Sequence, residues 1–227
     1  MAKPGGEDGA DCWLVVFDCD GVLVDSETLV VDIDVKAVTA VGWPVTREEV
    51  IELFVGKSVA DMRRMIESRV GTSVSDDWDA PWQGEYRHAL EVLLEPVDGV
   101  RDAVKAIEAA GYRTCVASSG AHEKMRGTLA KTGLWDMFEG RIFSVSEVDH
   151  GKPAPDLFLH AAATMGFHPS RCVVVEDSRY GVAAARAAGM GVIGYAGGVT
   201  PRSHLHDAHE VIDAMGDLPD AVDRLAG

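Results

Sequence analysis

Positive charge is scarce in this chain of 227 residues, which has 21 Lys and Arg against 37 Asp and Glu and a formal net charge of -16. Nucleic acids and anionic membranes bind proteins through basic surfaces, so the excess of acid argues against both as partners. The same excess limits any site for an anionic substrate. Such a site needs its own local cations, because the overall field of the protein repels the substrate.

The sequence also lacks hydrophobic runs that could cross a bilayer and closely spaced pairs of cysteines. Residues 1–10 are polar and glycine-rich, which predicts a disordered tail and no secretory signal. Because no Cys-x-x-Cys pair is present, a zinc site is disfavoured. We therefore expect a cytoplasmic protein with reduced thiols at Cys12, Cys19, Cys115 and Cys172.

Two patterns of hydrophobicity divide the chain. From residue 97 onward, short apolar runs alternate with helical stretches of about 10–15 residues, which is typical of βαβ units and a parallel sheet. Runs such as "CVVV" at residues 172–175 are apolar throughout, as expected when helices cover both faces of the sheet. Residues 26–96 predict helices only. The sequence thus predicts a Rossmann-like α/β core, formed by residues 11–25 and 97–227, with an inserted all-helical cap domain at 26–96.

Polar residues follow several of the predicted strands. Ligands of an open parallel sheet bind beyond the carboxyl ends of its strands, so these residues are candidates for one site. The candidates are Asp18 and Asp20, Ser118 and Ser119, Lys152 in a nearby loop, and Glu176 and Asp177. The carboxylates alone would repel one another, but carboxylate and carbonyl oxygens are suitable ligands for Mg²⁺.

Each of these residues also has a structural explanation when it is taken singly. Ser and Asp at the end of a strand often cap the next helix, and we expect Ser119 to cap a helix that begins at Ala121. A single loop lysine such as Lys152 is usually solvated. Helix capping does not explain why all these residues arrive at the same edge of one sheet. A site in which Mg²⁺, Lys152 and Ser118 hold a phosphate does explain this arrangement.

Four segments carry a resemblance to a known family. The strings "DCDGVLVDSE", "VASSG", "HGKPAPD" and "VVVEDS" resemble, in their usual order, the four motifs of the haloacid dehalogenase superfamily. A helical insert directly after the first motif is similar to the subgroup that includes β-phosphoglucomutase and many sugar-phosphate phosphatases. This resemblance implies a small phosphorylated substrate and Mg²⁺ as cofactor.

The resemblance also implies roles for the polar residues. Asp18 would be the nucleophile that forms an aspartyl phosphate, and Asp20 the general acid and then the general base. The implied metal site consists of Asp18, the backbone carbonyl of Asp20, and Asp177, with Glu176 in the outer shell. The implied phosphate-binding residues are Ser118, Ser119 and Lys152.

Three other activities are possible on this scaffold, and the sequence disfavours each. True dehalogenases lack an acid at the position of Asp20. The β-phosphoglucomutase group carries a His where this chain has Val30, and an Arg in the cap loop, where this chain has no Arg until Arg63. A catalytically silent binding protein would not need Asp18, Asp20, Lys152 and Asp177 together. The sequence therefore favours a phosphatase. Its motif sequences are most similar to those of phosphatases that act on sugar or sugar-acid phosphates, including 6-phosphogluconate.

Residues outside the four motifs are weaker candidates. Gly56, Lys57 and Ser58 in the cap are possible substrate contacts, although Ser58 could simply cap a helix beside a solvated Lys57. His122 or Lys124 could add to specificity. The aromatic residues of the cap are expected to form its core, and they include Trp78, Trp82 and Tyr86.

The segment "SHLHDAH" contains His204, His206 and His209. These residues could bind a transition metal, but no helix or strand fixes their spacing, so we favour a solvated loop. For the whole chain we expect a monomer or a weak dimer.

Overall fold

The computed structural model describes residues 12–227, and the predicted tail at 1–10 lies outside them. Its core is a parallel sheet with the strand order β3-β2-β1-β4-β5-β6. The strands are β1 (Leu14–Phe17), β2 (Arg113–Ser118), β3 (Ile142–Ser144), β4 (Cys172–Glu176), β5 (Gly191–Tyr195) and β6 (Glu210–Ile212). The predicted parallel sheet is thus confirmed. The pattern missed β6, a strand of three residues that begins with a glutamate.

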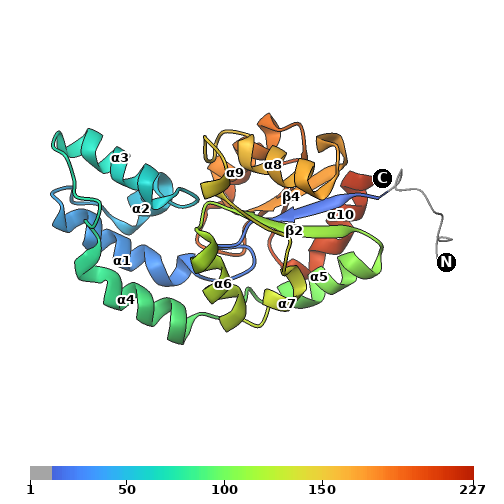
Figure 1. Ribbon diagram of the computed structural model, residues 1–227, viewed down its shortest axis with the longest axis horizontal. Coiled ribbons are helices and arrows are strands. Elements are labelled where there is room, and N and C mark those ends of the chain that lie inside the picture. The colour runs from blue at the N-terminus through green and yellow to red at the C-terminus, as the bar shows by residue number, and fades with distance from the viewer. Residues whose placement is uncertain (1–11) are drawn as a thin grey trace.

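Helices cover both faces of this sheet, as predicted (Figure 1). On β1, Val15 and Phe17 pack against one set of helices, and Leu14 and Val16 pack against the other. The first set is α5 (Val100–Ala109), α6 (His122–Lys131), α7 (Trp135–Phe138) and α10 (Leu218–Ala226). The second is α8 (Asp156–Met165) and α9 (Arg179–Ala187). Because neighbours along a strand face opposite sides, a strand buried on both faces must be apolar at every position.

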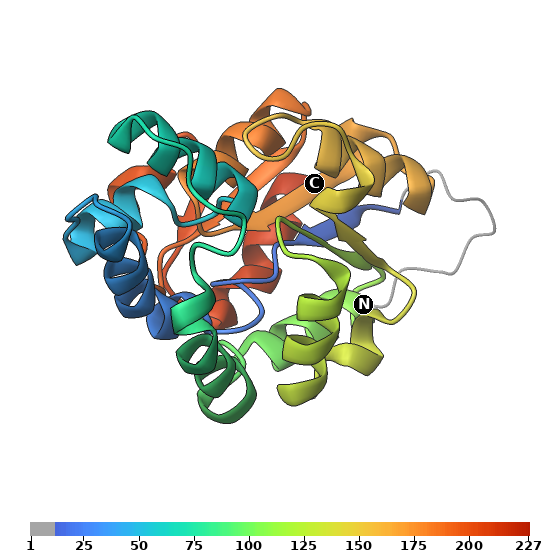
Figure 2. The same cartoon turned by 60° about the vertical axis from the view of Figure 1, so that its left-hand side comes forward.

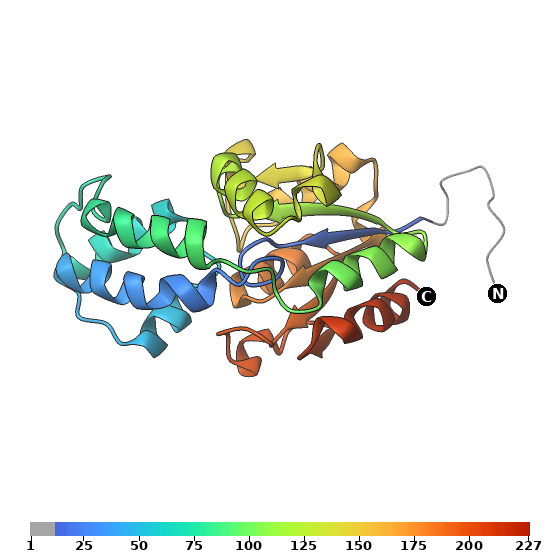
Figure 3. The ribbon, with the colours of Figure 1, turned by 90° about the horizontal axis from the view of Figure 1, so that it is seen from below.

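A helical insert follows β1 and returns to the sheet at β2 by way of α5. It contains α1 (Glu27–Ala40), α2 (Arg47–Leu53), α3 (Val59–Val70), η1 (Ala80–Trp82), α4 (Gln83–His88) and η2 (Ala89–Leu93). It has its own hydrophobic core, which includes the predicted Trp78 and is flanked by Trp82. The Tyr86 hydroxyl donates a hydrogen bond to Asp34 at 2.5 Å. This helical cap lies beyond the carboxyl ends of the strands (Figure 1, Figure 2, Figure 3).

Two chain segments connect the cap to the core, and they run side by side. Val24 and Pro96 form an antiparallel bridge, and the Asp25 amide donates to the Glu95 carbonyl at 3.0 Å. The connections therefore lie next to residues 26 and 96, where the sequence places the domain boundaries, and those boundaries stay a prediction.

Short helical turns complete the core: η3 (Val145–Glu147), η4 (Pro169–Arg171), η5 (Arg202–Leu205) and η6 (Met215–Asp217). All four cysteines are free. Within residues 12–227, no helix has the length and apolar character needed to cross a membrane.

Candidate active site

The carboxyl ends of β1, β2 and β4 bring the predicted residues together. Phe17 pairs with Val175 in the sheet, and the next amide, that of Asp18, donates to the Val175 carbonyl at 3.0 Å. Glu176 and Asp177 therefore emerge beside Asp18. Because β2 is the other neighbour of β1, its last residue, Ser118, reaches the same edge.

Lys152 is the buried cation of this edge. Its Nζ lies 2.5 Å from Asp18 Oδ1 and 2.7 Å from Glu176 Oε1, and it donates to the Ala117 carbonyl at 3.3 Å. All three residues are buried: Lys152 is 4 % exposed, Asp18 is 6 % exposed and Glu176 is 1 % exposed. Burial opposes the charge of Lys152, but the two carboxylates outweigh it and raise its pKa. Burial raises the pKa of Asp18 to about 7, against the opposing effect of Lys152. Lys152 thus provides local positive charge for an anionic substrate, which the acidic protein as a whole does not.

Asp20 has a separate set of partners. Its Oδ1 accepts from the Ser26 hydroxyl at 2.6 Å, and its Oδ2 accepts from Lys124 Nζ at 2.8 Å. Burial works to raise the pKa of Asp20, but the Lys124 ammonium outweighs it and holds that pKa below its usual value. Lys124 was expected only as a possible specificity residue, and the structure pairs it directly with a motif carboxylate. His122 lies 2.8 Å from Glu147 and does not line the pocket described below.

The carboxylate of Asp177 is the feature that fits a metal. Its Oδ2 is buried and has no hydrogen-bond partner among residues 12–227. Burial also raises the pKa of Asp177. The Oδ2 atom lies against Gly21, where φ is +78° and a Cβ atom would come within 2.0 Å of it. Gly21 therefore serves both the turn after β1 and the close approach of Asp177. A buried oxygen without a partner, in the same acidic edge as Asp18, suits a divalent cation.

The other two acids in the predicted metal set face elsewhere. Glu176 accepts from Lys152 and, through Oε2, from the amide and hydroxyl of Ser178 at 2.7 and 2.9 Å. The Asp20 side chain is occupied by Ser26 and Lys124. In the described part of the chain, no three His, Cys, Asp or Glu residues form a ready-made metal cluster. Of the four acids in the predicted metal set, Asp18 and Asp177 are therefore the two with a carboxylate oxygen that has no hydrogen bond from residues 12–227.

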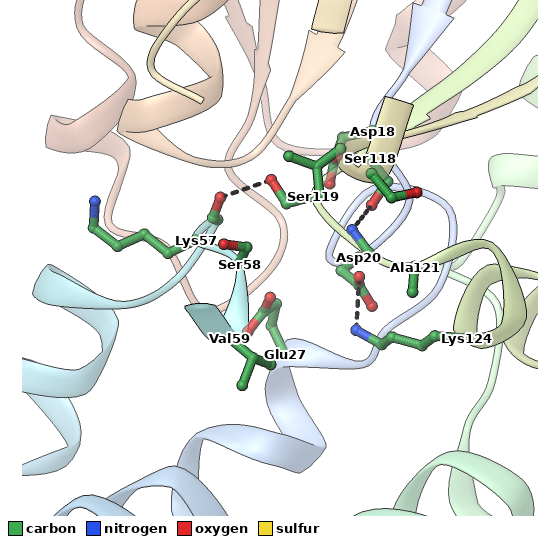
Figure 4. Close-up of a pocket in the computed structure, with 14 residues that line it drawn as sticks. Asp18, Asp20, Glu27, Lys57, Ser58, Val59, Ser118, Ser119, Ala121 and Lys124 are labelled. Atoms are coloured by element: carbon green, nitrogen blue, oxygen red, sulfur yellow. Dashed lines mark hydrogen bonds and ion pairs between the residues drawn. The ribbon is translucent and has the colours of Figure 1, made fainter. Parts of the chain in front are cut away.

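A pocket of about 390 Å³ lies between this edge and the cap (Figure 4). Core residues and the loop before α3 line it together: Asp18, Asp20, Glu27, Gly56, Lys57, Ser58, Val59, Ser118, Ser119, Gly120, Ala121, Lys124, Val145 and Ser146. Seven of the ten predicted site residues therefore line it, and the other three, Lys152, Glu176 and Asp177, are buried.

The expected role of Ser119 as a helix cap is wrong. Helix α6 begins at His122, its N-cap is Ala121, and no side chain caps it. The Ser119 hydroxyl instead donates to the Gly56 carbonyl of the cap at 3.2 Å. The Ser118 hydroxyl accepts from the Gly120 amide at 3.1 Å, which orders the turn between them. The hydroxyl of Ser119 therefore contacts the cap and leaves the helix end to other groups.

The cap residues of the pocket have structural partners of their own. Ser58 caps α3, because its hydroxyl accepts from the Asp61 amide at 3.2 Å. The Lys57 ammonium lies 3.7 Å from the centre of the Tyr180 ring, so this half-buried side chain packs on the core and does not match the alternative of a freely solvated lysine. In Figure 4 this ammonium points away from Asp18 and Asp20. Contact between these residues and a substrate stays a prediction.

Glu27 is a pocket residue that the sequence analysis missed. It starts α1, lines the pocket and is half-buried. Within residues 12–227 its carboxyl has no hydrogen bond or ion pair, and burial, helped by Asp20, raises its pKa to about 8. The only signal in the sequence was its place directly after the first motif, in "DSE".

The three histidines near the C-terminus do not converge. His204 Nε2 lies 2.6 Å from Glu52 Oε2 in the cap, His206 Nδ1 lies 2.8 Å from the Ser203 carbonyl, and His209 Nδ1 accepts from the Val192 amide at 3.0 Å. The possible metal site is thus wrong. The prediction of a solvated loop is also wrong at His204, because its side chain is only 14 % exposed and contacts the cap.

Comparison with known proteins agrees with this geometry. The haloacid dehalogenase-like hydrolase family matches residues 14–189. The chain is 27 % identical over 207 residues to 6-phosphogluconate phosphatase of Escherichia coli K12, covering 91 % of this chain and 92 % of that one. It is 29 % identical over 189 residues to hexitol phosphatase B of the same strain, with coverages of 77 % and 79 %.

Among solved structures, a haloacid dehalogenase-like protein of unknown function from Agrobacterium tumefaciens is 35 % identical with a TM-score of 0.78. The match covers 95 % of this chain and 100 % of that one. The family match spans most of the sheet and the whole cap. The chain belongs to the haloacid dehalogenase-like hydrolase family.

Proposed function

We propose that this hydrolase is a Mg²⁺-dependent phosphatase that releases phosphate from a small phosphorylated sugar or sugar acid through an aspartyl phosphate. The observation that carries the proposal is the state of Asp18. Lys152 holds its Oδ1, while Oδ2 has no hydrogen bond from residues 12–227 and the residue lines the pocket. A carboxylate fixed through one oxygen and open at the other is arranged as a nucleophile.

In the first step, Asp18 Oδ2 attacks phosphorus and the bond from phosphorus to the sugar oxygen breaks. The leaving oxygen takes a proton from Asp20, which lies two residues away on the same turn. Asp20 is held by Ser26 and Lys124, and the negative charge of an arriving phosphate favours its protonated form. The Lys152 ammonium and the Ser118 hydroxyl balance the charge on the phosphoryl oxygens.

In the second step, water attacks the phosphorus of the aspartyl phosphate. Asp20, now ionised, takes a proton from this water, and the bond between phosphorus and Asp18 breaks to give inorganic phosphate. The Lys124 ion pair supports this half of the cycle, because it favours the ionised form of Asp20.

Mg²⁺ would be held by the carboxylates of Asp18 and Asp177 and by the backbone carbonyl of Asp20. When bound, it supplies positive charge to the transferring phosphoryl group. The buried, unpartnered Oδ2 of Asp177 supports this assignment. Glu176 would contribute indirectly, by orienting Lys152 and Ser178.

The substrate class rests on relatives and on the pocket. Two relatives that align over most of this chain are phosphatases of 6-phosphogluconate and of hexitol phosphates. The pocket offers the hydroxyls of Ser58 and Ser146 and the carboxyl of Glu27, which are groups that can bond to the hydroxyls of a polyol.

The test is phosphate release from a panel of hexose, hexitol and sugar-acid phosphates, with Mg²⁺ and with chelator. We expect release from a related subset, loss with chelator, and restoration by added Mg²⁺. Conversion of a hexose 1-phosphate into its 6-phosphate without release of phosphate would identify a mutase. No turnover of any panel member, nor of p-nitrophenyl phosphate, would contradict catalysis altogether.

A further inference from the structure

The loop that forms the cap side of the pocket is fastened to the core at several points. It follows α2 and comprises residues 54–58, the last three of which line the pocket. The contacts involve the beginning of α9 and the turn η5, on the core side. The residues of α9 and η5 that make these contacts are Arg179, Tyr180 and His204, and none of the three lines the pocket.

The first contact is an ionic cluster at the end of α2. Glu52 of the cap pairs with Arg179, the first residue of α9, and its Oε2 lies 2.6 Å from His204 Nε2. Arg179 Nη2 also lies 2.9 Å from His204 Nε2. The Arg179 hydrogen bond holds the pKa of Glu52 below its usual value. Three elements are thus joined at one carboxylate.

The second contact is made by Tyr180. Its hydroxyl donates to the Leu53 carbonyl at 3.2 Å, and its ring lies under the Lys57 ammonium at 3.7 Å. One residue of α9 therefore contacts the chain on both sides of residues 54–56. The Lys57 amide closes the loop by donating to the Phe54 carbonyl at 2.9 Å.

The third contact is a close approach of the Gly56 backbone to the Ser178 side chain. Gly56 has a φ of +84°, and a Cβ atom there would lie 2.3 Å from the Ser178 hydroxyl. On its other side, the Gly56 carbonyl accepts from Ser119. The loop is therefore seated between the turn after β4 and the turn after β2, which both carry motif residues.

We propose that Glu52, Arg179, Tyr180 and His204 form a clasp that positions residues 54–58 over the catalytic pocket. They are positioning residues, because they contact the loop and none of them lines the pocket. This inference rests on the proposed function for its kinetic consequence only. The clasp itself is a property of the folded chain and can be measured without substrate.

The first test measures hydrogen exchange in the full chain, without substrate, for wild type and the double variant Arg179→Met with Tyr180→Phe. Met keeps the length of the Arg stem, and Phe keeps the ring under Lys57 while it removes the donor to Leu53. We expect exchange in residues 53–59 to rise by about tenfold, with β1 and β4 unchanged. Cleavage by trypsin after Lys57 should accelerate in parallel.

The matched control is Arg202→Met. Arg202 is an exposed arginine at the start of η5, and it pairs with Asp213 at 2.7 Å within the core, away from the cap. Unchanged exchange in the double variant, or an equal rise in the control, would overturn the clasp. Arg179→Lys retains the positive charge, so residues 53–59 should keep part of the protection from exchange that the double variant loses.

A kinetic measurement separates positioning from general structural support. With 6-phosphogluconate the double variant should show a KM raised by about five- to tenfold, at a kcat within about twofold of wild type. A fall in kcat with unchanged KM would contradict a role in positioning the loop. If the wild type turns over no substrate, the proposed function fails, while the exchange experiment still decides the clasp.

Discussion

On the core side of the pocket, the side chains of Asp18, Lys152 and Glu176 are 8 %, 2 % and 1 % exposed, and Lys152 bonds to both carboxylates. On the cap side, Ser58 caps its own helix and Lys57 lies on Tyr180. The core groups depend on partners far along the chain and deep in the protein, so removal of one leaves another charged and buried. The polar groups of the cap have their hydrogen-bond and cation–π partners near the surface. Substitutions in the cap can therefore occur without leaving a buried charge unpaired.

The largest expected effect is on the core side. Asp18→Asn should lower phosphate release by about 10⁴-fold or more, because the amide cannot act as the nucleophile. Asp32→Asn makes the same change on an exposed cap residue that pairs with Arg47. Its rate should stay within about twofold of wild type. Comparable losses in both variants, measured with p-nitrophenyl phosphate, would contradict the assignment of the nucleophile.

Lys152→Met tests the buried charges directly. At pH 7 the free energy of unfolding should fall by about 3–5 kcal/mol, because Asp18 and Glu176 lose their shared cation. Lys36→Met removes a cap ion pair of similar length, 2.6 Å to Glu85, in which the Lys36 side chain is 50 % exposed. That loss should be about 0–1 kcal/mol. Urea unfolding of both variants checks the contrast, and similar losses would mean that burial does not distinguish the two sides.

Two glycines sharpen the comparison within the cap. Gly56 and Gly71 have φ values of +84° and +76°, but only Gly56 has atoms of another element where its Cβ would lie. Gly71→Ala should cost about 1 kcal/mol of stability and leave kinetics unchanged. Gly56→Ala has the same backbone cost and should also raise KM by about tenfold, since the loop can no longer seat on Ser178. Equal kinetics for the two variants would show that the seat is dispensable.

The smallest effect concerns Glu27, where cap and core meet. Its pKa is raised from 4.5 to about 8, so between these values the folded chain holds more protons than the unfolded chain. The contribution of Glu27 to stability is therefore greatest below pH 4.5 and falls as pH rises toward 8. Glu27→Gln cannot ionise and should be more stable than wild type at pH 8, and little changed at pH 4.5. We expect a gain of about 1 kcal/mol, well below the full linkage of the pKa shift, because the side chain is only half-buried and water screens its charge. Urea unfolding at both pH values measures the gain, and its absence at pH 8 would mean that Glu27 ionises freely.

Local patterns in the sequence were sufficient for the sheet and for the edge that carries the acids. Strands buried on both faces must be apolar at each position, so β1 and β4 were visible, and their last residues led to Asp18 and Glu176. Parallel topology then required these ends to meet. The three-residue β6 carries too short and too polar a pattern to be found in this way.

Partnerships across the chain were decided by tertiary structure alone. Lys124 and Asp20 are 104 residues apart, and Tyr180 and Leu53 are 127 apart, so no local pattern links them. Ser119 was a plausible helix cap by sequence, yet the cap domain offered the Gly56 carbonyl instead. The sequence by itself determined which groups reach the carboxyl edge, because strand periodicity is local. Which of them pair, and how the cap covers them, depended on packing between elements that are distant in the chain.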